Sequence, residues 1–403
     1  MEEWKEYQIA DICKIKHGFA FKGQYFTDCK QPYVCITPGN FAIKGGFKLN
    51  KPKYYNGPIP ENYILHANDL IITMTDLSKE GDTLGYSALV PQSSDYIFLH
   101  NQRIGLVEEI NDKIDKHFLY WIMRTYDYQK YIVKHCSGST VKHTSPNNIG
   151  SYFFKAPSLK KQKDIASILD NFEAKIELNR RINANLEAQA QALFRSWFVD
   201  FEPFRDGPFV DSELGKIPQG WEIGTLSEIA DITMGQSPKG SSYNEEGNGI
   251  IFYQGRAEFG NRFPSIRLYT TEPTRIAEIN SVLLSVRAPV GDINIAKNTC
   301  CIGRGLAAIK SKHGCNSFIL YLLQSLKPLL EQYNGEGTVF GCINRKEIEG
   351  LPIIIPKESV INEFEEIVEK IDSEIKNLTI EQENLSALRD TLLPKLMAGE
   401  IKI

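Results

Sequence analysis

Two stretches of the chain concentrate basic and small polar side chains and contain no acidic residue. Residues 129–163 hold seven lysines and two histidines, and residues 293–330 hold five lysines and arginines. Within the first stretch, residues 134–148 interleave cations with serine, threonine and asparagine. Cations hold phosphates, while hydroxyl and amide groups bond to phosphates and to the edges of bases. This combination indicates contacts to nucleic acid, although an ordinary solvated surface would show a similar composition.

We therefore select DNA-contacting candidates from these stretches and from the arginines around them, whose guanidinium groups suit guanine or phosphate. Lys134 and Lys142 are predicted to contact phosphates, and Asn147 and Arg256 are predicted to affect sequence choice. The full set of predicted DNA-contacting residues is Lys134, Ser139, Thr140, Lys142, His143, Asn147, Arg256, Arg262, Arg287, Arg304, Thr338 and Arg345.

Sequence signatures of catalysis were sought and not found. The chain has no phosphate-binding P-loop motif, no H-E-x-x-H, no G-x-S-x-G and no kinase motif set. It also lacks the Asn-Pro-Pro-aromatic run expected of enzymes that methylate bases. His135 and His143 have no cysteine or acid at metal-ligand spacing, and the glycines of 235–249 do not match a dinucleotide fingerprint. We predict no catalytic residue, no metal and no cofactor in this chain.

Length and charge bound the remaining possibilities. A chain of 403 residues predicts two or three domains. Its 46 basic and 50 acidic residues give a net charge of −4, which excludes a uniformly basic coat. The first residues do not resemble a signal peptide, and no apolar run is long enough for a membrane helix. The eight cysteines form no C-x-x-C pair, so we expect reduced thiols in a cytoplasmic protein.

The sequence contains a repeat of domain size. A tryptophan followed by Ala-Asp-Ile occurs near Trp4 and again near Trp221, and Asn68 precedes an apolar run much as Asn280 does. The Gly-Ser-Thr-Val run at 138–141 returns as Gly-Thr-Val at 337–339. The two halves therefore have the same plan, and short runs such as 33–36, 70–72 and 353–355 indicate strands within it.

Each half ends in a stretch whose apolar residues alternate in steps of four and three. The pattern covers 165–197 and recurs 199 residues later over 364–396, with Asn179, Asn183 and Gln382 as polar interruptions. A sustained 3.5-residue period predicts a coiled-coil helix, and two such helices favour pairing with each other. If the pair is antiparallel and centred, Asn179 would lie near Gln382. The alternative is that each helix packs only on its own domain.

The predicted fold is therefore mixed α/β, with two similar globular domains separated by two long antiparallel helices. We expect domain 1 over 1–157, helix 1 over 158–200, a linker over 201–218, domain 2 over 219–356 and helix 2 over 357–403. The last segment has six basic and eleven acidic residues, so this helix should stay off DNA. The predicted helix-interface residues are Phe172, Ile176, Asn179, Leu186, Leu193, Trp197, Ile371, Ile375, Leu378, Gln382, Leu385 and Leu392.

The ends of both helical stretches carry motifs that resemble a known family. The run Ala192-Leu-Phe-Arg-Ser-Trp-Phe-Val-Asp-Phe-Glu-Pro-Phe204, followed by residues 211–221, is similar to the central conserved segment of type I restriction-modification specificity subunits. Residues 388–401 resemble their distal conserved segment. The two-fold repeat with long helices matches their architecture, so the resemblance covers the whole chain. The domains between the motifs are not diagnostic, because each member recognises its own DNA sequence.

The resemblance implies a mechanism. Each globular domain would be a target-recognition domain that binds one half of a bipartite site in double-stranded DNA, and the helices would set the gap between the halves. The subunit would not be catalytic. It would recruit two adenine-methyltransferase modification subunits, and through them restriction and translocase subunits. S-adenosylmethionine, ATP and Mg²⁺ would then belong to those partners.

Two other classes of function remain open at the level of sequence. One is a non-catalytic coiled-coil structural or adaptor protein that does not bind DNA. The other is a nuclease or methyltransferase with diverged motifs. Salt-sensitive binding to duplex DNA separates the first from a specificity subunit, and S-adenosylmethionine binding by the isolated chain separates the second.

Overall fold

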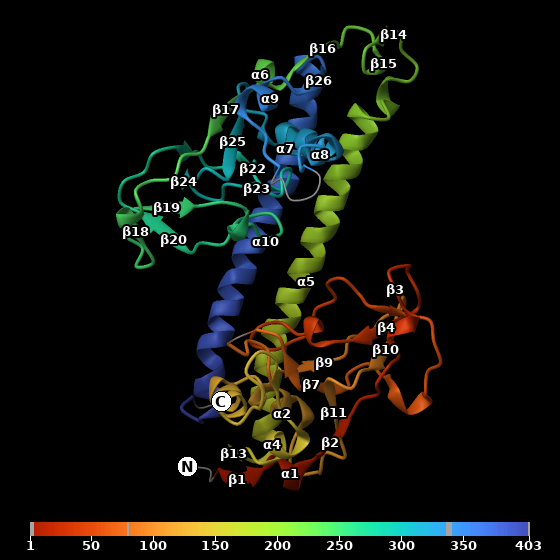
Figure 1. The fold of residues 1–403 in the computed structure, drawn as a ribbon, viewed down its shortest axis with the longest axis vertical. Helices are drawn as coiled ribbons and strands as arrows, with labels where there is room; N and C mark the ends of the chain where they lie inside the picture. The colour runs from red at the N-terminus through yellow and green to blue at the C-terminus, as the bar shows by residue number, and fades with distance from the viewer. Residues whose placement is uncertain (1–3, 79, 336–340, 402–403) are drawn as a thin grey trace. The chain divides into compact units, whose positions relative to one another are not determined.

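The computed structural model describes residues 4–78, 80–335 and 341–401, and the chain divides into two compact units. The first unit is Met1–Leu178 with Glu381–Ile403, and the second is Asn179–Ile380. Each unit combines one globular domain with parts of two long helices, α5 (Leu159–Phe198) and α10 (Glu358–Met397) (Figure 1). The two mixed α/β domains and the two long helices predicted from the sequence are present.

The domain of the first unit contains a five-stranded sheet in the order β3-β5-β4-β10-β6 and a four-stranded sheet in the order β2-β11-β7-β9. The pairs β1-β13 and β12-β8 complete its strands. In chain order the strands are Lys5–Gln8 (β1), Lys14–His17 (β2), Phe26–Thr27 (β3), Tyr33–Ile36 (β4), Tyr54–Tyr55 (β5), Ile64–Leu65 (β6), Leu70–Thr73 (β7), Thr75–Asp76 (β8), Ser87–Leu89 (β9), Ile97–His100 (β10), Ile104–Glu108 (β11), Lys142–His143 (β12) and Phe153–Ala156 (β13).

The domain of the second unit repeats the five-stranded and four-stranded sheets of the first. Among the described residues, a single bridge between Arg287 and Cys342 stands in place of the β12-β8 pair. Its sheets have the orders β18-β20-β19-β24-β21 and β17-β25-β22-β23, and β16 pairs with β26 as β1 pairs with β13. Its strands are Phe209–Ser212 (β14), Gly215–Pro218 (β15), Glu222–Thr225 (β16), Ala230–Met234 (β17), Tyr243–Asn244 (β18), Ile250–Tyr253 (β19), Leu268–Thr270 (β20), Ile276–Ala277 (β21), Val282–Ser285 (β22), Ile293–Ile295 (β23), Cys300–Ile302 (β24), Leu306–Ser311 (β25) and Pro352–Ile355 (β26).

Strand register is equivalent in the two domains as well. In the first domain β4 and β10 run parallel, with Val34 opposite Phe98. In the second, β19 and β24 run parallel, with Phe252 opposite Cys301. The central strands β7 and β22 are wholly buried and rich in leucine, isoleucine and valine. Such continuous apolar runs fit strands that are covered on both faces.

Short helices lie at equivalent places in both domains. The first domain has α1 (Ile9–Ile12), α2 (Lys116–Ile122), α3 (Tyr126–Lys134) and α4 (Pro146–Gly150), and the second has α6 (Leu226–Ile229), α7 (Asn316–Ser325), α8 (Lys327–Glu331) and α9 (Arg345–Glu349). The 3₁₀ turns are Gly23–Tyr25 (η1), Pro38–Asn40 (η2), Glu61–Tyr63 (η3), Glu202–Phe204 (η4), Gly240–Ser242 (η5) and Arg256–Glu258 (η6).

A carboxylate caps the N-terminus of both α2 and α7, but it comes from a different part of the chain in each case. At α2, the carboxylate of Asp115 accepts hydrogen bonds from the backbone N–H groups of His117 and Phe118, both at 3.0 Å. At α7, Glu365 of the long helix α10 accepts those of Ser317 and Phe318, at 3.0 and 2.9 Å. In both cases a carboxylate satisfies N–H groups that the helix itself leaves unpaired.

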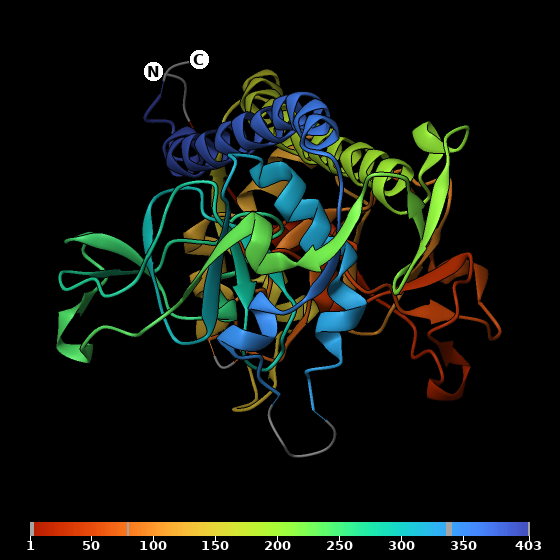
Figure 2. The same cartoon turned by 90° about the horizontal axis from the view of Figure 1, so that it is seen from above.

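Within each unit the two long helices pack side by side and run antiparallel (Figures 1 and 2). In the first unit, Glu173 of α5 is ion-paired with Arg389 of α10 at 2.6 Å. In the second unit, Asn183 donates a hydrogen bond to Thr379 at 3.1 Å, and the rings of Phe194 and Phe364 lie 5.7 Å apart. Asn183 and Phe364 lie at positions of the predicted 3.5-residue seam.

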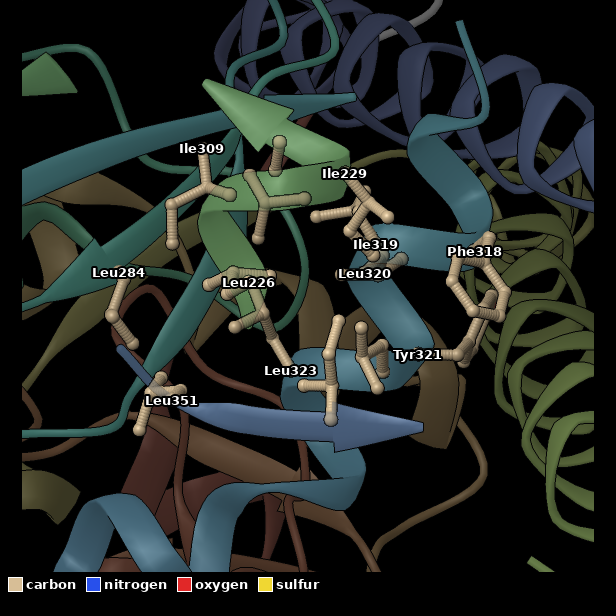
Figure 3. Close-up of a cluster of buried hydrophobic side chains, with 14 of the residues drawn as sticks. Leu226, Ile229, Leu284, Ile309, Phe318, Ile319, Leu320, Tyr321, Leu323 and Leu351 are labelled. Atoms are coloured by element: carbon tan, nitrogen blue, oxygen red, sulfur yellow. The ribbon is translucent and has the colours of Figure 1, made fainter. Parts of the chain in front are cut away.

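The largest hydrophobic core lies in the second unit, where α7 packs between the four-stranded sheet and the long helices. Figure 3 shows Leu284 and Ile309 of the sheet facing the buried residues of α6 and α7. Helix α7 is apolar on almost every side, with seven consecutive buried residues from Ser317 to Leu323. A helix of this composition is stable only when it is surrounded by other elements.

Several local features of the structure can be compared with the predictions made from the sequence. Strands occupy the three runs in which the sequence indicated them, as β4, β7 and β26. The stretch predicted to be a linker contains a hairpin, β14-β15, in which Val210 lies opposite Ile217. All eight cysteines are free thiols, five of them buried. None of the described helices is long and apolar enough to cross a membrane.

Candidate nucleic-acid interface

In the first domain, backbone hydrogen bonds join the loop after the central strand β7 to the basic segment predicted from the sequence. The strand β8 pairs with β12, so that Thr75 lies opposite His143 and Asp76 lies opposite Lys142. Thr144 then donates from its backbone N–H to the carbonyl of Met74 at 3.0 Å. We call the described residues of the loop 74–84, which are 74–78 and 80–84, together with the segment 136–144, the first paired-loop site. The basic segment is thus fixed to a rigid strand end.

Predicted DNA-contacting residues of this domain gather at or beside this site. Lys142 is half-buried and His143 is exposed on β12, where its Nδ1 lies 3.1 Å from the hydroxyl of Thr75. Ser139 and Thr140 are exposed in the segment before β12. Lys134 is exposed at the end of α3, and Asn147 is exposed on α4. These six residues therefore lie on elements that meet at the first paired-loop site.

The loop 74–84 is held in a turn by the side chain of Asp76. Its carboxylate accepts hydrogen bonds from the backbone N–H of Ser78 (2.7 Å) and from the backbone N–H (2.6 Å) and hydroxyl (2.8 Å) of Thr83. Burial alone would raise the pKa of the Asp76 carboxyl, but these hydrogen bonds outweigh it and hold the pKa below its usual value. The turn therefore contains a buried, ionised carboxylate.

Two exposed residues near the site were missed from the sequence. Leu77, which follows Asp76, is 69% exposed, and Tyr126 at the start of α3 is 70% exposed. Tyr126, Lys130 and Lys134 recur every four residues and so form a stripe on α3, with the ammonium of Lys130 5.8 Å from the ring of Tyr126. The spacing of this stripe is visible in the sequence, whereas the exposure of Leu77 is not.

The second domain builds the corresponding site with a shorter loop. Ile343 donates from its backbone N–H to the carbonyl of Val286 at 3.1 Å, as Thr144 does to Met74 in the first domain. Arg287 and Cys342 form a β-bridge where Thr75 and His143 pair in the first domain. We call the loop 286–290 with residues 341–343 the second paired-loop site.

Three predicted arginines lie on elements that meet at this second site. Arg287 is exposed on the loop itself, and Arg304 is exposed on a turn whose Gly305 carbonyl accepts a hydrogen bond from the backbone N–H of Val286 (2.9 Å). Arg345 is exposed on α9, directly after the segment, and pairs with Glu349 at 2.7 Å. Thr338 lies outside the described residues.

Two other predicted arginines face different surroundings. Arg256 is exposed but paired with Asp292, and it lines a groove of about 870 Å³ within the second unit, between α5 and the loop after β19. The side chain of Arg262 is only 10% exposed, because its guanidinium pairs with Glu187 of α5 and Asp372 of α10. Arg262 therefore lies in an ion cluster with both long helices, and the DNA contact predicted for it stays a prediction.

The first unit has a similar ion cluster with the charges exchanged: one carboxylate contacts two arginines, whereas Arg262 contacts two carboxylates. There the carboxylate of Glu173 on α5 contacts two arginines, Arg124 of the domain at 3.4 Å and Arg389 of α10 at 2.6 Å. Arg124 is also bonded through Nε to the carbonyl of Lys44, and Lys44 pairs with Asp390 of α10 at 2.7 Å. In each unit, a mostly buried ion cluster fastens the domain to both helices.

The twelve residues predicted for the helix interface are all buried or half-buried. In the first unit, Ile165 and Leu169 of α5 share a core with Leu393 and Leu396 of α10. Among the described residues, no group of three or more histidine, cysteine, aspartate or glutamate side chains is placed to hold a metal ion.

Comparisons with known proteins agree with this arrangement. The family model for the type I restriction modification DNA specificity domain matches residues 1–188 and 218–389. A putative type I restriction enzyme MjaX specificity subunit from Methanocaldococcus jannaschii is 36% identical over 312 residues, covering 76% of this chain and 72% of that protein. The HindI specificity subunit of Haemophilus influenzae is 25% identical over the full length of both chains.

A solved structure supports the fold. The type I restriction-modification S subunit from M. genitalium superposes with a TM-score of 0.58 at 17% sequence identity, covering 98% of this chain and 96% of that one. At this identity the likeness concerns the arrangement of domains and helices. The matched family segments in this chain each contain one of the two paired-loop sites, which places the candidate interface inside both conserved modules.

Proposed function

Because the chain belongs to the type I restriction-modification DNA specificity family, in which it is the DNA-recognising and not the catalytic subunit, we propose that its two domains bind the two halves of a bipartite site. The observation that supports this most directly is the repeated bond between the loop after the central strand and the segment before the next short helix. It presents polar and basic residues at the same place in both domains. A coiled-coil adaptor would not need this repetition.

The partners of the chain follow from the same family assignment. DNA and the other subunits of a restriction-modification complex are its partners. In our proposal two adenine-methyltransferase subunits dock on the helices and supply S-adenosylmethionine, and restriction subunits supply ATP- and Mg²⁺-dependent translocation. The complex would act in the cytoplasm, where its DNA is found.

Sequence choice and affinity should depend on different residues of the paired-loop sites. Lys134 and Lys142 are flexible cations, suited to phosphates, which fix position without reporting sequence. Arg287 and Asn147 end in planar donor or amide groups, which can pair with guanine or adenine in the major groove.

The test is duplex binding by the complex of this chain with its modification subunits, measured as a function of salt. Lys134→Ala and Lys142→Ala should each weaken binding to all sequences and lower the salt slope by about one. Lys14→Ala, which removes an exposed lysine of β2 that is ion-paired with Glu109, is the matched control and should leave the slope unchanged. If neither paired-loop variant changes affinity or slope, the interface is located elsewhere.

A further inference from the structure

The loop 74–84 contains a large apolar side chain that is exposed to solvent instead of packing within the domain. Leu77 is 69% exposed, although a leucine gains free energy when it leaves water. It stands between the buried Asp76 and the half-buried Ser78. Its position is therefore set by the turn rather than by packing of its own.

The turn around Leu77 is rigidly built. Besides the three hydrogen bonds to Asp76, the hydroxyl oxygen of Ser78 accepts the backbone N–H groups of Gly81 and Asp82, both at 2.9 Å. Gln129 of α3 donates through Nε2 to the carbonyl of Gly81 at 2.8 Å. A loop backbone held this way loses little further conformational freedom on binding, which is the physical advantage of a pre-organised contact.

The loop that contains this turn is longer in the first domain than in the second. Between the same two anchor points, the first domain has eleven residues, Met74 to Leu84, where the second has five, Val286 to Val290. The extra residues enlarge the loop beside Lys142 and the exposed end of the basic segment. In the second domain the same loop presents Arg287, a side chain suited to base recognition.

The acidic residues of the loop disfavour contact with DNA phosphates and favour contact with base edges. Glu80 and Asp82 are exposed on the same loop as Leu77, and carboxylates are repelled by phosphates. They are tolerated at base edges in the major groove, where the amino group of cytosine is a donor. The apolar group available in that groove is the 5-methyl group of thymine.

We propose that Leu77 is a specificity-determining residue that contacts a thymine methyl group in the major groove of one half-site, and that the Asp76 turn positions it. This inference rests on the proposed function and names the chemistry that one loop recognises. Asp76 and Thr83 act as positioning residues, because they hold the turn without reaching the DNA.

The experiment is a chemical double-mutant cycle on the assembled modification complex. The probes are site duplexes in which each thymine is replaced singly by uracil, which removes only the methyl group. The wild-type complex should lose about fourfold in affinity at one thymine in one half-site, the value of one buried methyl group. Leu77→Ala should lose a similar factor on the unmodified duplex and show no further loss with uracil at that position.

Two variants keep the result interpretable. Ile97→Ala truncates another exposed apolar residue of the same domain and should retain the wild-type uracil profile. Thr83→Val removes the hydroxyl that donates to Asp76 and should erase sensitivity at the same thymine while leaving the other thymines unchanged. A Thr83→Val complex with the wild-type profile would overturn the positioning role.

The contradicting outcomes are distinct. Equal uracil profiles for the wild type and Leu77→Ala would overturn the contact with thymine. Loss of assembly with the modification subunits in Leu77→Ala would place the residue on a protein interface and overturn the proposal. A wild-type complex that does not distinguish its site from a scrambled duplex would contradict the proposed function itself, before any variant is compared.

Discussion

The two globular domains share their topology but differ in the surfaces that they expose. Both have the same strand orders, the same single parallel pair within the five-stranded sheet and the same backbone bond from a strand-end loop to a later segment. The loop of the first domain is long and built around a buried carboxylate, whereas that of the second is short and presents Arg287. The fold is thus duplicated, while the exposed residues of the two paired-loop sites differ.

A second contrast concerns how each domain is fastened to the helices. In the first unit two arginines share the carboxylate of Glu173, and in the second unit two carboxylates share the guanidinium of Arg262. The charges are exchanged, yet the geometric result is equivalent. Both halves therefore attach the domain to the helices through an ion cluster, with opposite arrangements of charge.

The largest expected effect comes from changing the helices on which both domains depend. Insertion of one heptad near Asn183 and a matching heptad near Gln382 preserves the 3.5-residue seam and lengthens each helix by about 10 Å. If the helices follow the DNA axis, the gap in the recognised site should grow by about three base pairs. A heptad in one helix alone should abolish activity, because it breaks the pairing.

Methylation mapping in cells reports the gap of the doubly inserted subunit. Three base pairs also rotate the second half-site by nearly a third of a turn, so lower activity is expected together with the longer gap. An unchanged gap with full activity would show that the helices do not set the spacing.

The ion cluster of the second unit offers a smaller and local test of the comparison. Arg262→Ala leaves Glu187 and Asp372 mostly buried without their shared cation, which should destabilise the second unit by about 3 kcal/mol and lower its unfolding temperature. Arg256→Ala, at a guanidinium whose side chain is 55% exposed, is the control and should cost less than about 1 kcal/mol. Calorimetry that gave equal shifts for both variants would contradict the anchoring role.

The smallest predicted effect is a pH dependence confined to the first unit. Asp170 of α5 accepts hydrogen bonds from His117 Nδ1 and Trp121 Nε1, both at 2.7 Å. The hydrogen bond to Asp170 raises the pKa of His117 above its usual value, although burial opposes it. The resulting stabilisation is complete below about pH 6.5 and is lost as the pH rises through the raised pKa.

The unfolding temperature of the wild type should therefore fall slightly more between pH 6 and pH 8 than that of His117→Gln, which cannot titrate. Identical pH dependence in the two proteins would show that the pair contributes nothing through protonation. The second unit, which does not contain this pair, supplies an internal reference in the same chain.

The parts of the fold that sequence could predict are those governed by periodic apolar patterns. The seam residues follow from spacing, because burial of one helix face leaves a regular trace, and β4, β7 and β26 follow from short continuous apolar runs. The hairpin at 209–218 was not anticipated, since its short strands lie among proline and glycine. The composition of the basic stretches indicated a candidate site, but it did not indicate what each cation contacts. Arg262 and Arg287 look alike in sequence, and only long-range contacts distinguish them.

The central claim is that two domains of one fold recognise two different DNA half-sites, and mapping the methylated bases in cells that contain the whole complex tests it most directly. Because the paired-loop sites differ in length, charge and exposed side chains, the map should give a motif of two unlike half-sites separated by a gap of fixed length. A palindromic motif, or a continuous motif without a gap, would contradict the account.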